Sequence, residues 1–219
     1  EALARSALGR LILIDKDHVD ITNVNRQIIA LLSTIGRPKV EVMKERIADI
    51  NPDCEVIALK MFYTEETYEE IFKHKIDFVV DASDTIIYKI HIIKECFRRN
   101  IPIISCMGAA NKMDPTRLKI TDISETHTDP IARVIRRKLK KAGIEKGVPV
   151  VFSDESPIVI RKDVRKYVGN DASKIRKEKM PPSSNAFVPS VAGLIMASYV
   201  VRKSLTGVPI ERVKDGAMV

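Results

Sequence analysis

Residues 10–39 read RLILIDKDHVDITNVNRQIIALLSTIGRPK, and this stretch decides the fold class. Its apolar run, 11–14, is typical of a strand buried on both faces of a parallel sheet. Asp15 follows at the edge where open α/β sheets bind ligands and where a carboxylate can hold a ribose hydroxyl. Three later residues suit phosphate oxygens through an amide, a guanidinium fork and an ammonium charge: Asn23, Arg26 and Lys39. The stretch therefore predicts a nucleotide site.

The residues that follow alternate between helical and strand patterns. Apolar residues at helical spacing predict helices over 39–50, 65–74 and 86–99. Short apolar or β-favouring runs predict strands over 55–60, 78–80 and 101–106. This alternation predicts an α/β fold, a doubly wound, Rossmann-like, mostly parallel sheet with helices on both faces. The strand over 78–80 ends near two carboxylates, Asp81 and Asp84, which suit a ribose or a magnesium ion.

The C-terminal half follows a different pattern. Strands are predicted over 118–123 and 148–152, with a basic helix over 130–142 and a closing apolar helix over 190–205. We therefore expect antiparallel additions to the sheet in this half. The segment 161–182 has many charges, no clear period and a Pro-Pro end, which predicts a flexible basic loop. No internal repeat is visible, so residues 1–219 are expected to form a single domain.

The first residues lack the glycine-rich loop that a dinucleotide-type fold places about 20 residues before its ribose-binding acid. Residues 1–8 have helical spacing, and Gly9 is expected to end that helix. We therefore expect a strand and a GxGxxG-like loop to precede residue 1.

The composition narrows the protein class. A hydrophobic content of 45% and a charged content of 30% are typical of a globular protein. The three cysteines are irregularly spaced and form no CxxC pair, which argues against a disulfide framework or a zinc ribbon and favours a reducing, cytoplasmic location. The longest apolar stretch, 188–201, is broken by polar residues and is shorter than the about 20 residues that span a bilayer, so no membrane association is expected.

The net charge of +8 is concentrated in the second half of the chain. Residues 133–146 carry a net charge of +6 and residues 161–179 carry +5, so the remainder is acidic. A large polyanion such as RNA is the natural partner for these segments, and a solvated basic face is the alternative. The helix residues expected to contact phosphates are Arg133, Arg136, Arg137, Lys140 and Lys141.

Four motifs together resemble a known family. Asp15-x-Asp17, Asn23-x-Asn25-Arg26-Gln27, Gly36-x-Pro38-Lys39 and Asp81-x-x-Asp84 resemble the ubiquitin-activating-like adenylation fold of the MoeB, ThiF and HesA proteins. The motifs of the C-terminal half, ITDI at 120–123, TDP at 128–130 and PSVAG at 189–193, are similar to the tRNA threonylcarbamoyladenosine dehydratases, the TcdA or CsdL group. The chain departs from the wider family in lacking CxxC pairs and from all its members in lacking the glycine loop.

The resemblance implies roles for the matching positions. Asp15 would hold the ATP ribose, while Asn23, Arg26 and Lys39 would contact the triphosphate. Arg26, Lys39 and Asp84 would be the catalytic residues. Asp84 would organise Mg²⁺ or the nucleotide and is the candidate metal ligand. For Asp17 and Asp81, a structural role in orienting loops at the sheet edge is as good an interpretation as a role in ligand binding. The family also implies a sodium or potassium ion, a homodimer and a sulfur-relay partner, none of which the sequence locates.

The implied reaction is the ATP-dependent dehydration of threonylcarbamoyladenosine in tRNA. Its threonyl carboxylate would be adenylated with release of pyrophosphate, and its ureido group would then close a ring and expel AMP, so no enzyme nucleophile is needed. The alternative is an activator of the C-terminal glycine of a ubiquitin-like carrier protein, as in MoeB and ThiF. Cys106 as a thioester nucleophile and His127 as a base are less favoured than a buried thiol and a polar loop whose Asp129 caps the following helix.

Overall fold

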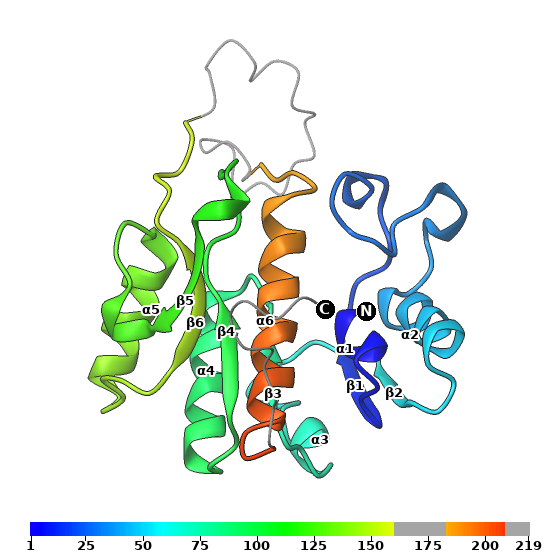
Figure 1. Ribbon diagram of the computed structural model, residues 1–219, viewed down its shortest axis with the longest axis horizontal. Coiled ribbons are helices and arrows are strands. Elements are labelled where there is room, and N and C mark those ends of the chain that lie inside the picture. Colours follow the sequence, from blue (N-terminus) through cyan, green and yellow to red (C-terminus); the bar gives the residue numbers. More distant parts are fainter. Residues whose placement is uncertain (160–182, 209–219) are drawn as a thin grey trace, which may run out of the picture.

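The computed structural model describes residues 1–159 and 183–208, and its strands form two sheets (Figure 1). In the first sheet β1 (Arg10–Ile14) pairs in parallel with β2 (Glu55–Leu59), so that Leu11 lies opposite Val56. The connection between them runs through α2 (Lys39–Ile50), whose Ile47 is buried with Ala4 and Cys54. Because the two strands are parallel, the crossover places the carboxyl ends of β1 and β2 at one edge of the sheet.

The second sheet has the order β3-β4-β6-β5. Three of its strands are parallel: β3 (Val79–Asp81), β4 (Ile103–Cys106) and β6 (Pro149–Ser153). At its edge β5 (Leu118–Asp122) runs antiparallel to β6. The expected antiparallel addition in the C-terminal half is therefore confirmed. Within the described ranges, no strand pairs with the second edge of β1 or of β3, and this separates the sheet into two.

Helices cover both faces of the second sheet (Figure 1). On one face α4 (Ile86–Arg98) and α5 (Pro130–Lys141) bury apolar residues that include Ile93, Ile135 and Leu139. On the other face α6 (Val188–Ser204) buries Met196 and Val200 against β4, β5 and β6. This arrangement confirms the predicted α/β, mostly parallel, doubly wound architecture.

Two predicted helices are much shorter in the structure. The first, α1, covers Ala2–Arg5 and is followed by Ala7 in the left-handed region (φ 58°), so the expectation that Gly9 ends it was wrong. The second, α3, covers Glu69–Phe72 instead of 65–74. The Thr67 hydroxyl donates to the Phe62 carbonyl at 2.5 Å and accepts from the Thr64 N–H at 2.9 Å. Such local bonds hold the preceding residues in a turn and compete with helix formation.

In the described ranges, four short 3-10 helices lie in the connections: Ile21–Asn23, Leu32–Thr34, Pro115–Arg117 and Ile123–Glu125. The segment 161–182, predicted to be a flexible basic loop, lies outside the described residues. The expected strand and glycine loop before residue 1 stay a prediction. In the part of the chain that is described, no helix has the length and apolar character needed to span a membrane.

Candidate nucleotide site

Three charged side chains meet where β1 ends and α2 begins. Lys39 Nζ lies 3.9 Å from Asp15 Oδ2 and 3.5 Å from Asp17 Oδ2. The lysine side chain is 12% exposed, whereas the Asp15 and Asp17 side chains are 39% and 54% exposed. Asp15 Oδ1 also accepts from the Asp17 backbone N–H at 2.8 Å, which fixes the turn after the strand. Lys39 is the first residue of α2, and its backbone N–H donates to the Asp17 carbonyl at 3.0 Å, which ties the start of the helix to the turn after β1.

Asn23 has a structural bond within its own loop. Its Oδ1 accepts from the Asp20 N–H at 3.1 Å, while Asp20 Oδ1 accepts from the Thr22 N–H at 2.8 Å. This reciprocal capping arrangement closes the 3-10 helix Ile21–Asn23, and Asn23 is buried. Bonds to Thr22 lower the pKa of the Asp20 carboxyl. Asn23 therefore shapes the loop that carries Arg26, whatever further contact its amide makes.

Arg26 is held by two acceptors at one of its nitrogens. Its Nη1 donates to the Thr22 carbonyl at 2.9 Å and to Asn25 Oδ1 at 3.0 Å. Within residues 1–159 and 183–208, Nε and Nη2 have no partner. The guanidinium thus keeps three N–H donors, one on Nε and two on Nη2, for an anionic ligand while the loop fixes its orientation.

The two carboxylates after β3 have different environments. Asp81 is buried, and its Oδ2 accepts from Lys89 Nζ at 2.9 Å and from Ser105 Oγ at 2.5 Å. This geometry favours the structural interpretation of Asp81. Asp84 is exposed and accepts a bond from Thr85 Oγ1 at 3.2 Å, so its carboxylate is open to a ligand.

The predicted residues therefore fall into three groups. Asp15, Asp17 and Lys39 contact one another, and Asn23 and Arg26 share one loop. Between the described residues, no hydrogen bond or ion pair joins Asp84 to either group, and no set of three His, Cys, Asp or Glu residues is arranged to hold a metal ion.

Cys106 and His127 show no feature of catalytic groups. Burial raises the pKa of the Cys106 thiol to about 11, which keeps it protonated at neutral pH. His127 is exposed, with its ring edge-on to Phe152, and Asp129 Oδ1 accepts from the N–H groups of Ile131 and Ala132 at 2.8 and 2.9 Å. The expected helix cap at Asp129 is thus confirmed.

In the basic helix α5, most of the residues predicted to contact RNA phosphates are exposed to solvent. Its exposed members are Arg133, Arg137, Lys140 and Lys141. Arg136 is turned inward, because its Nη1 donates to the Thr126 carbonyl at 2.6 Å and to Thr126 Oγ1 at 2.5 Å. Lys140 also lies 3.7 Å from Glu145 Oε1. The structure thus separates Arg136, which holds the loop before the helix, from the solvent-exposed basic side chains of α5.

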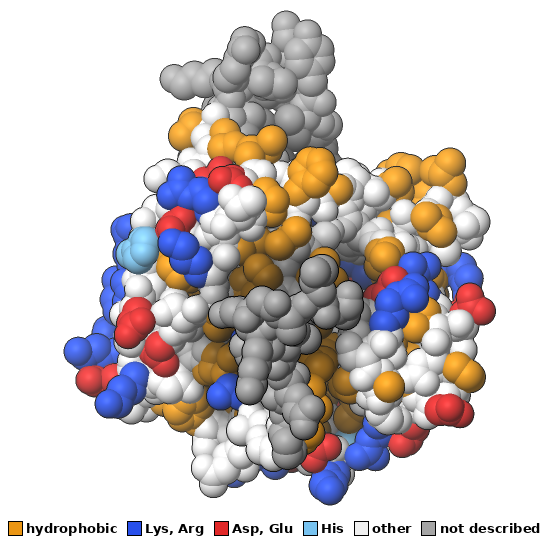
Figure 2. All heavy atoms as spheres, in the orientation of Figure 1, with side chains coloured by type: hydrophobic (Ala, Val, Ile, Leu, Met, Phe, Trp, Pro, Cys, Tyr) orange, Lys and Arg blue, Asp and Glu red, His pale blue; other side chains and the backbone are white. Residues whose placement is uncertain are grey.

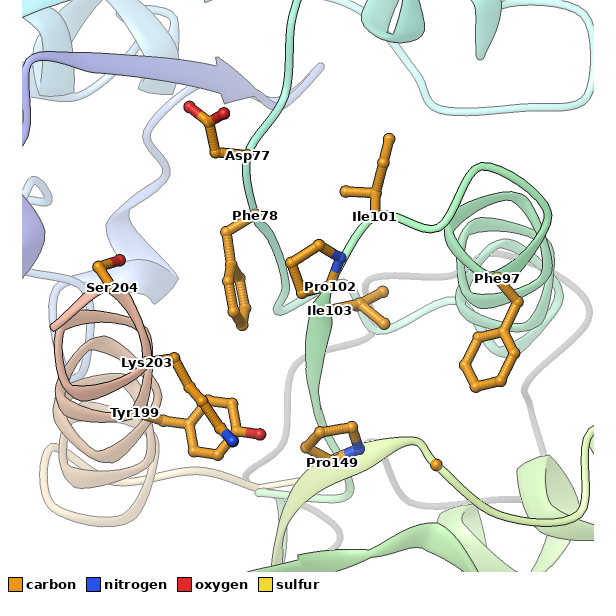
Figure 3. A pocket seen from close by; sticks show the side chains of 11 residues that line it. Asp77, Phe78, Phe97, Ile101, Pro102, Ile103, Pro149, Tyr199, Lys203 and Ser204 are labelled. Carbon is orange, nitrogen blue, oxygen red and sulfur yellow. The ribbon is translucent and has the colours of Figure 1, made fainter. Parts of the chain in front are cut away.

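A cavity of about 500 Å³, shown in Figure 3, is lined by none of these site residues. It is formed at the starts of the strands, by Phe78 before β3, Ile103 in β4 and Pro149 in β6, with Tyr199 and Lys203 from α6. Open α/β sheets bind ligands at the opposite, carboxyl ends of their strands. The cavity and the Asp15–Lys39 cluster are therefore separate features.

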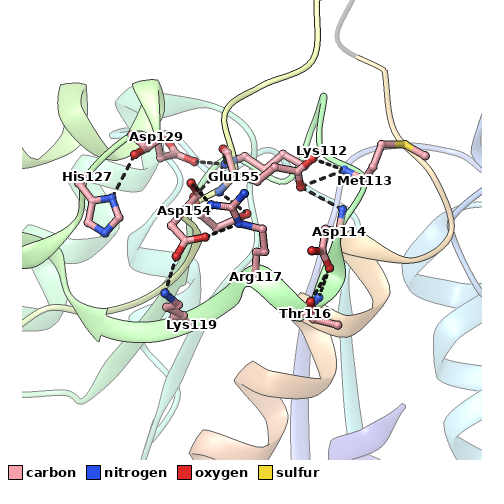
Figure 4. A network of polar contacts seen from close by, with 12 residues as sticks. Lys112, Met113, Asp114, Thr116, Arg117, Lys119, His127, Asp129, Asp154 and Glu155 are labelled. Atoms are coloured by element: carbon pink, nitrogen blue, oxygen red, sulfur yellow. Dashed lines mark hydrogen bonds and ion pairs between the residues drawn. The ribbon is translucent and has the colours of Figure 1, made fainter.

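The sequence interpretation missed two buried lysines. Lys89 is the one charged residue on the buried face of α4, at helical spacing before Ile93 and Cys96, and this position was the available signal. Lys112 Nζ lies 3.3 Å from Asp129 Oδ2 and donates to the carbonyls of Ser153 and Glu155 at 3.0 and 3.1 Å (Figure 4). No sequence periodicity identifies Lys112, because it lies in a loop.

Known proteins of one family are similar to this chain. The ThiF family model matches residues 1–216. The tRNA threonylcarbamoyladenosine dehydratase of Bacillus subtilis is 73% identical over 215 residues, which cover 98% of this chain and 85% of that protein. A crystal structure of the Escherichia coli tRNA threonylcarbamoyladenosine dehydratase TcdA in complex with ATP has a TM-score of 0.78 at 32% identity, covering 94% of this chain and 81% of that one.

More distant similarity extends to an adenylyltransferase. The molybdopterin-synthase adenylyltransferase of Haemophilus influenzae is 32% identical over 112 residues, 51% of this chain and 45% of that protein.

The structure of the E. coli TcdA complex with AMP has a TM-score of 0.80 at 32% identity, covering 94% of this chain and 80% of that one. With the ThiF model matching almost every residue, the chain belongs to the ThiF family.

Proposed function

We propose that the protein is an ATP-dependent tRNA threonylcarbamoyladenosine dehydratase. The observation that carries the proposal is the 73% identity to the B. subtilis enzyme of that name over nearly the whole chain. The structure of the E. coli TcdA complex with ATP supports the nucleotide, since it has the same fold. The substrate is then a carboxylate on a modified adenosine of tRNA, and the location is the cytoplasm.

The reaction follows from the chemistry of a carboxylate. The threonyl carboxylate attacks the α-phosphorus of ATP, which forms an acyl adenylate and releases pyrophosphate. The ureido group of the same substituent then attacks the acyl carbon and expels AMP, for a net loss of one water. Charge gathers on phosphate oxygens in the first step, where Arg26 and Lys39 stabilise it. The second step is intramolecular, and proximity supplies much of its acceleration.

The site residues have environments that fit these roles. Lys39 is loosely paired at 3.5 and 3.9 Å, so a phosphate can replace the carboxylates around it. Asp15 is partly exposed at the end of β1, where it holds the ribose. Asn23 shapes the triphosphate loop and contacts the triphosphate through its remaining amide donors.

A magnesium ion is compatible with the residues present. Mg²⁺ in nucleotide sites is held by one or two carboxylates together with substrate phosphates and water, so a cluster of three protein ligands is not required. Asp84 supplies an exposed carboxylate after β3 and is the residue that would hold the ion. The ion would neutralise pyrophosphate oxygens. A sodium or potassium ion is part of the proposal without an assigned position.

The deciding experiment uses ATP, Mg²⁺ and tRNA that carries threonylcarbamoyladenosine. After incubation with the protein, digestion to nucleosides and mass spectrometry should show a product lighter by one water, with AMP and pyrophosphate released. No such product from substrate that the B. subtilis enzyme converts would refute the proposal. Pyrophosphate exchange that requires a ubiquitin-like carrier protein and not tRNA would instead support the carrier-activating alternative.

The tRNA is expected to contact the exposed basic side chains of α5. Arg133, Arg137, Lys140 and Lys141 line the solvent side of this helix, opposite the buried Ile135 and Leu139. Phosphate contacts of this kind position an RNA without reading its sequence. A sulfur-relay protein is a further partner in this proposal, to be tested by co-purification.

The protein is expected to form a homodimer through the segment 21–35. Its exposed apolar side chains are Ile21, Val24, Ile28, Leu31, Leu32 and Ile35. They gather on one part of the molecular surface, at the upper right of Figure 2. Apolar patches of this kind mark interaction surfaces. Sedimentation should show a dimer that Leu32→Glu dissociates, and a monomeric parent protein would refute this.

A further inference from the structure

Asn25 belongs to the sequence motif around Arg26, but it has no assigned role in nucleotide binding or in the packing of the fold. Its side-chain amide makes two bonds that face different parts of the chain. Oδ1 accepts from Arg26 Nη1 at 3.0 Å, and Nδ2 donates to the Ser184 carbonyl at 3.0 Å. Arg26 has only donors and a carbonyl only accepts, so just one orientation of the amide satisfies both partners.

Ser184 belongs to a short segment, residues 183–185, and Asn111 binds the neighbouring residue of this segment, Ser183. The Asn111 N–H donates to the Ser183 carbonyl at 2.8 Å, and Asn111 Oδ1 accepts from the Ser183 N–H at 2.8 Å and from its hydroxyl at 2.9 Å. Asn185 Nδ2 adds a bond to the Lys112 carbonyl at 2.8 Å. The segment is thus tied to the loop between β4 and β5.

That loop is itself anchored in the core of the second sheet. Buried Lys112 joins it to the ends of α5 and β6, and the Glu155 carboxylate accepts from the N–H groups of Met113 and Asp114 at 3.0 Å (Figure 4). Hydrogen bonds, with the peptide bond between Ser183 and Ser184, therefore connect this buried region through Asn111 to Asn25 and Arg26.

We propose that Asn25 is a positioning residue that orients Arg26 toward the nucleotide, and that residues 183–185, held by Asn111, keep Asn25 in place. The proposal rests on the proposed function, in which Arg26 contacts the triphosphate. An arginine side chain that is already ordered loses less freedom when phosphate binds. Because Asn25 uses only Nη1, it leaves the Nε and Nη2 donors of Arg26 available.

The test measures the dissociation constant of Mg·ATP with the full chain, which requires no tRNA. Asn25→Ala should weaken ATP binding about fivefold, equal to about 1 kcal/mol. Asn25→Asp should weaken it at least as much, since its carboxylate pairs with Arg26 and repels the triphosphate. Asn51→Ala is the matched control: its amide also joins two backbone segments, through the carbonyls of Ala4 and Leu8, but away from Arg26. It should leave ATP binding unchanged.

Asn111 gives the sharper test because it does not contact Arg26. It has a positive φ of 57°, so Asn111→Gly removes the side chain without backbone strain. This variant should weaken ATP binding about threefold, and Asn111→Asp, which keeps Oδ1, should restore it. In the double variant with Asn25→Ala the loss should stay near fivefold, because both changes break the same chain of bonds.

The outcomes separate the proposal from the function on which it rests. If Arg26→Ala weakens ATP binding but the Asn25 and Asn111 effects multiply to about fifteenfold, the two residues act independently and the positioning proposal is wrong. Wild-type ATP binding in Asn25→Ala would also overturn it. If Arg26→Ala binds ATP normally, both the positioning proposal and the assignment of Arg26 fail, while dehydration of the tRNA substrate still tests the proposed reaction.

Discussion

Two lysine–aspartate clusters follow strands of the two sheets, and they differ in burial. Lys89 Nζ lies 2.9 Å from Asp81 Oδ2, and both side chains are 2% exposed. Lys39 Nζ lies 3.5 and 3.9 Å from Asp17 and Asp15, whose side chains are open to solvent. The same pair of residue types thus occurs once as a closed contact and once as a loose one.

The difference in burial fits a structural role for the Lys89–Asp81 pair and the proposed binding role for Lys39. A buried ion pair tolerates the loss of neither partner, because the remaining charge would be desolvated without compensation. Serine hydroxyls complete the shell of Asp81, with Ser105 Oγ at 2.5 Å and Ser83 Oγ at 2.7 Å. An exposed pair contributes little to stability, so its lysine can exchange carboxylates for phosphate at small cost.

The largest expected effect is on the buried cluster. Lys89→Met should lower the free energy of unfolding by about 3–5 kcal/mol, because it leaves the Asp81 carboxylate buried without its cation. Urea denaturation measures this change. The control is the double variant Lys89→Met, Asp81→Asn, which removes both charges and should recover part of the loss. A single variant as stable as the parent would contradict the distinction between the two clusters.

The loose cluster should respond in the opposite way. Lys39→Met is expected to change the free energy of unfolding by less than about 1 kcal/mol, since its pairs are long and its partners exposed. It should weaken Mg·ATP binding by a factor of about 10–100, because one charge-assisted contact with a phosphate is lost. Titration calorimetry measures the affinity. Unchanged affinity together with a large loss of stability would assign Lys39 to the fold instead of the site.

The sequence predicted the exposed cluster better than the buried one, for a physical reason. Asp15 and Lys39 lie at the end of an apolar strand and the start of an amphipathic helix, where local patterns fix their position. Asp81 was ambiguous because its partners, Lys89 and Ser105, come from a later helix and strand. Burial of a carboxylate depends on such long-range contacts, which residue spacing does not encode.

The same limit explains the other differences. The order of strands and helices could be predicted from apolar periodicity, and the antiparallel β5 from the different pattern of the C-terminal half. The short length of α3 could not be predicted from apolar spacing, because side-chain hydrogen bonds of Thr67 replace the backbone bonds of a helix. The bridge from Asn25 to Ser184 joins residues 159 positions apart, and no local motif predicts it.

A smaller effect is expected on the basic helix, where inward and outward arginines can be compared. Arg137→Glu should weaken tRNA binding and reduce the slope of log affinity against log salt by about 1, as for the loss of one phosphate contact. Filter binding at several salt concentrations measures both. Arg136→Met serves as the comparison and should instead lower stability, because it frees the buried Thr126 carbonyl. Equal salt slopes for Arg137→Glu and the parent would leave α5 as a solvated face.

The smallest effect is expected at Cys106, which lies at the end of β4 beside the buried cluster. Burial raises the pKa of its thiol to about 11, with the Asp81 charge adding to the shift and the Lys89 charge opposing it. At pH 8 only about one thiol in a thousand is then ionised. Alkylation of the native protein should be slow and rise about tenfold per pH unit from pH 8 to 10. Cys106→Ser should keep full dehydratase activity, because ring closure needs no enzyme thiol. Rapid labelling of Cys106 at pH 8, or loss of turnover in a folded Cys106→Ser variant, would mean that the buried cluster borders the chemistry after all.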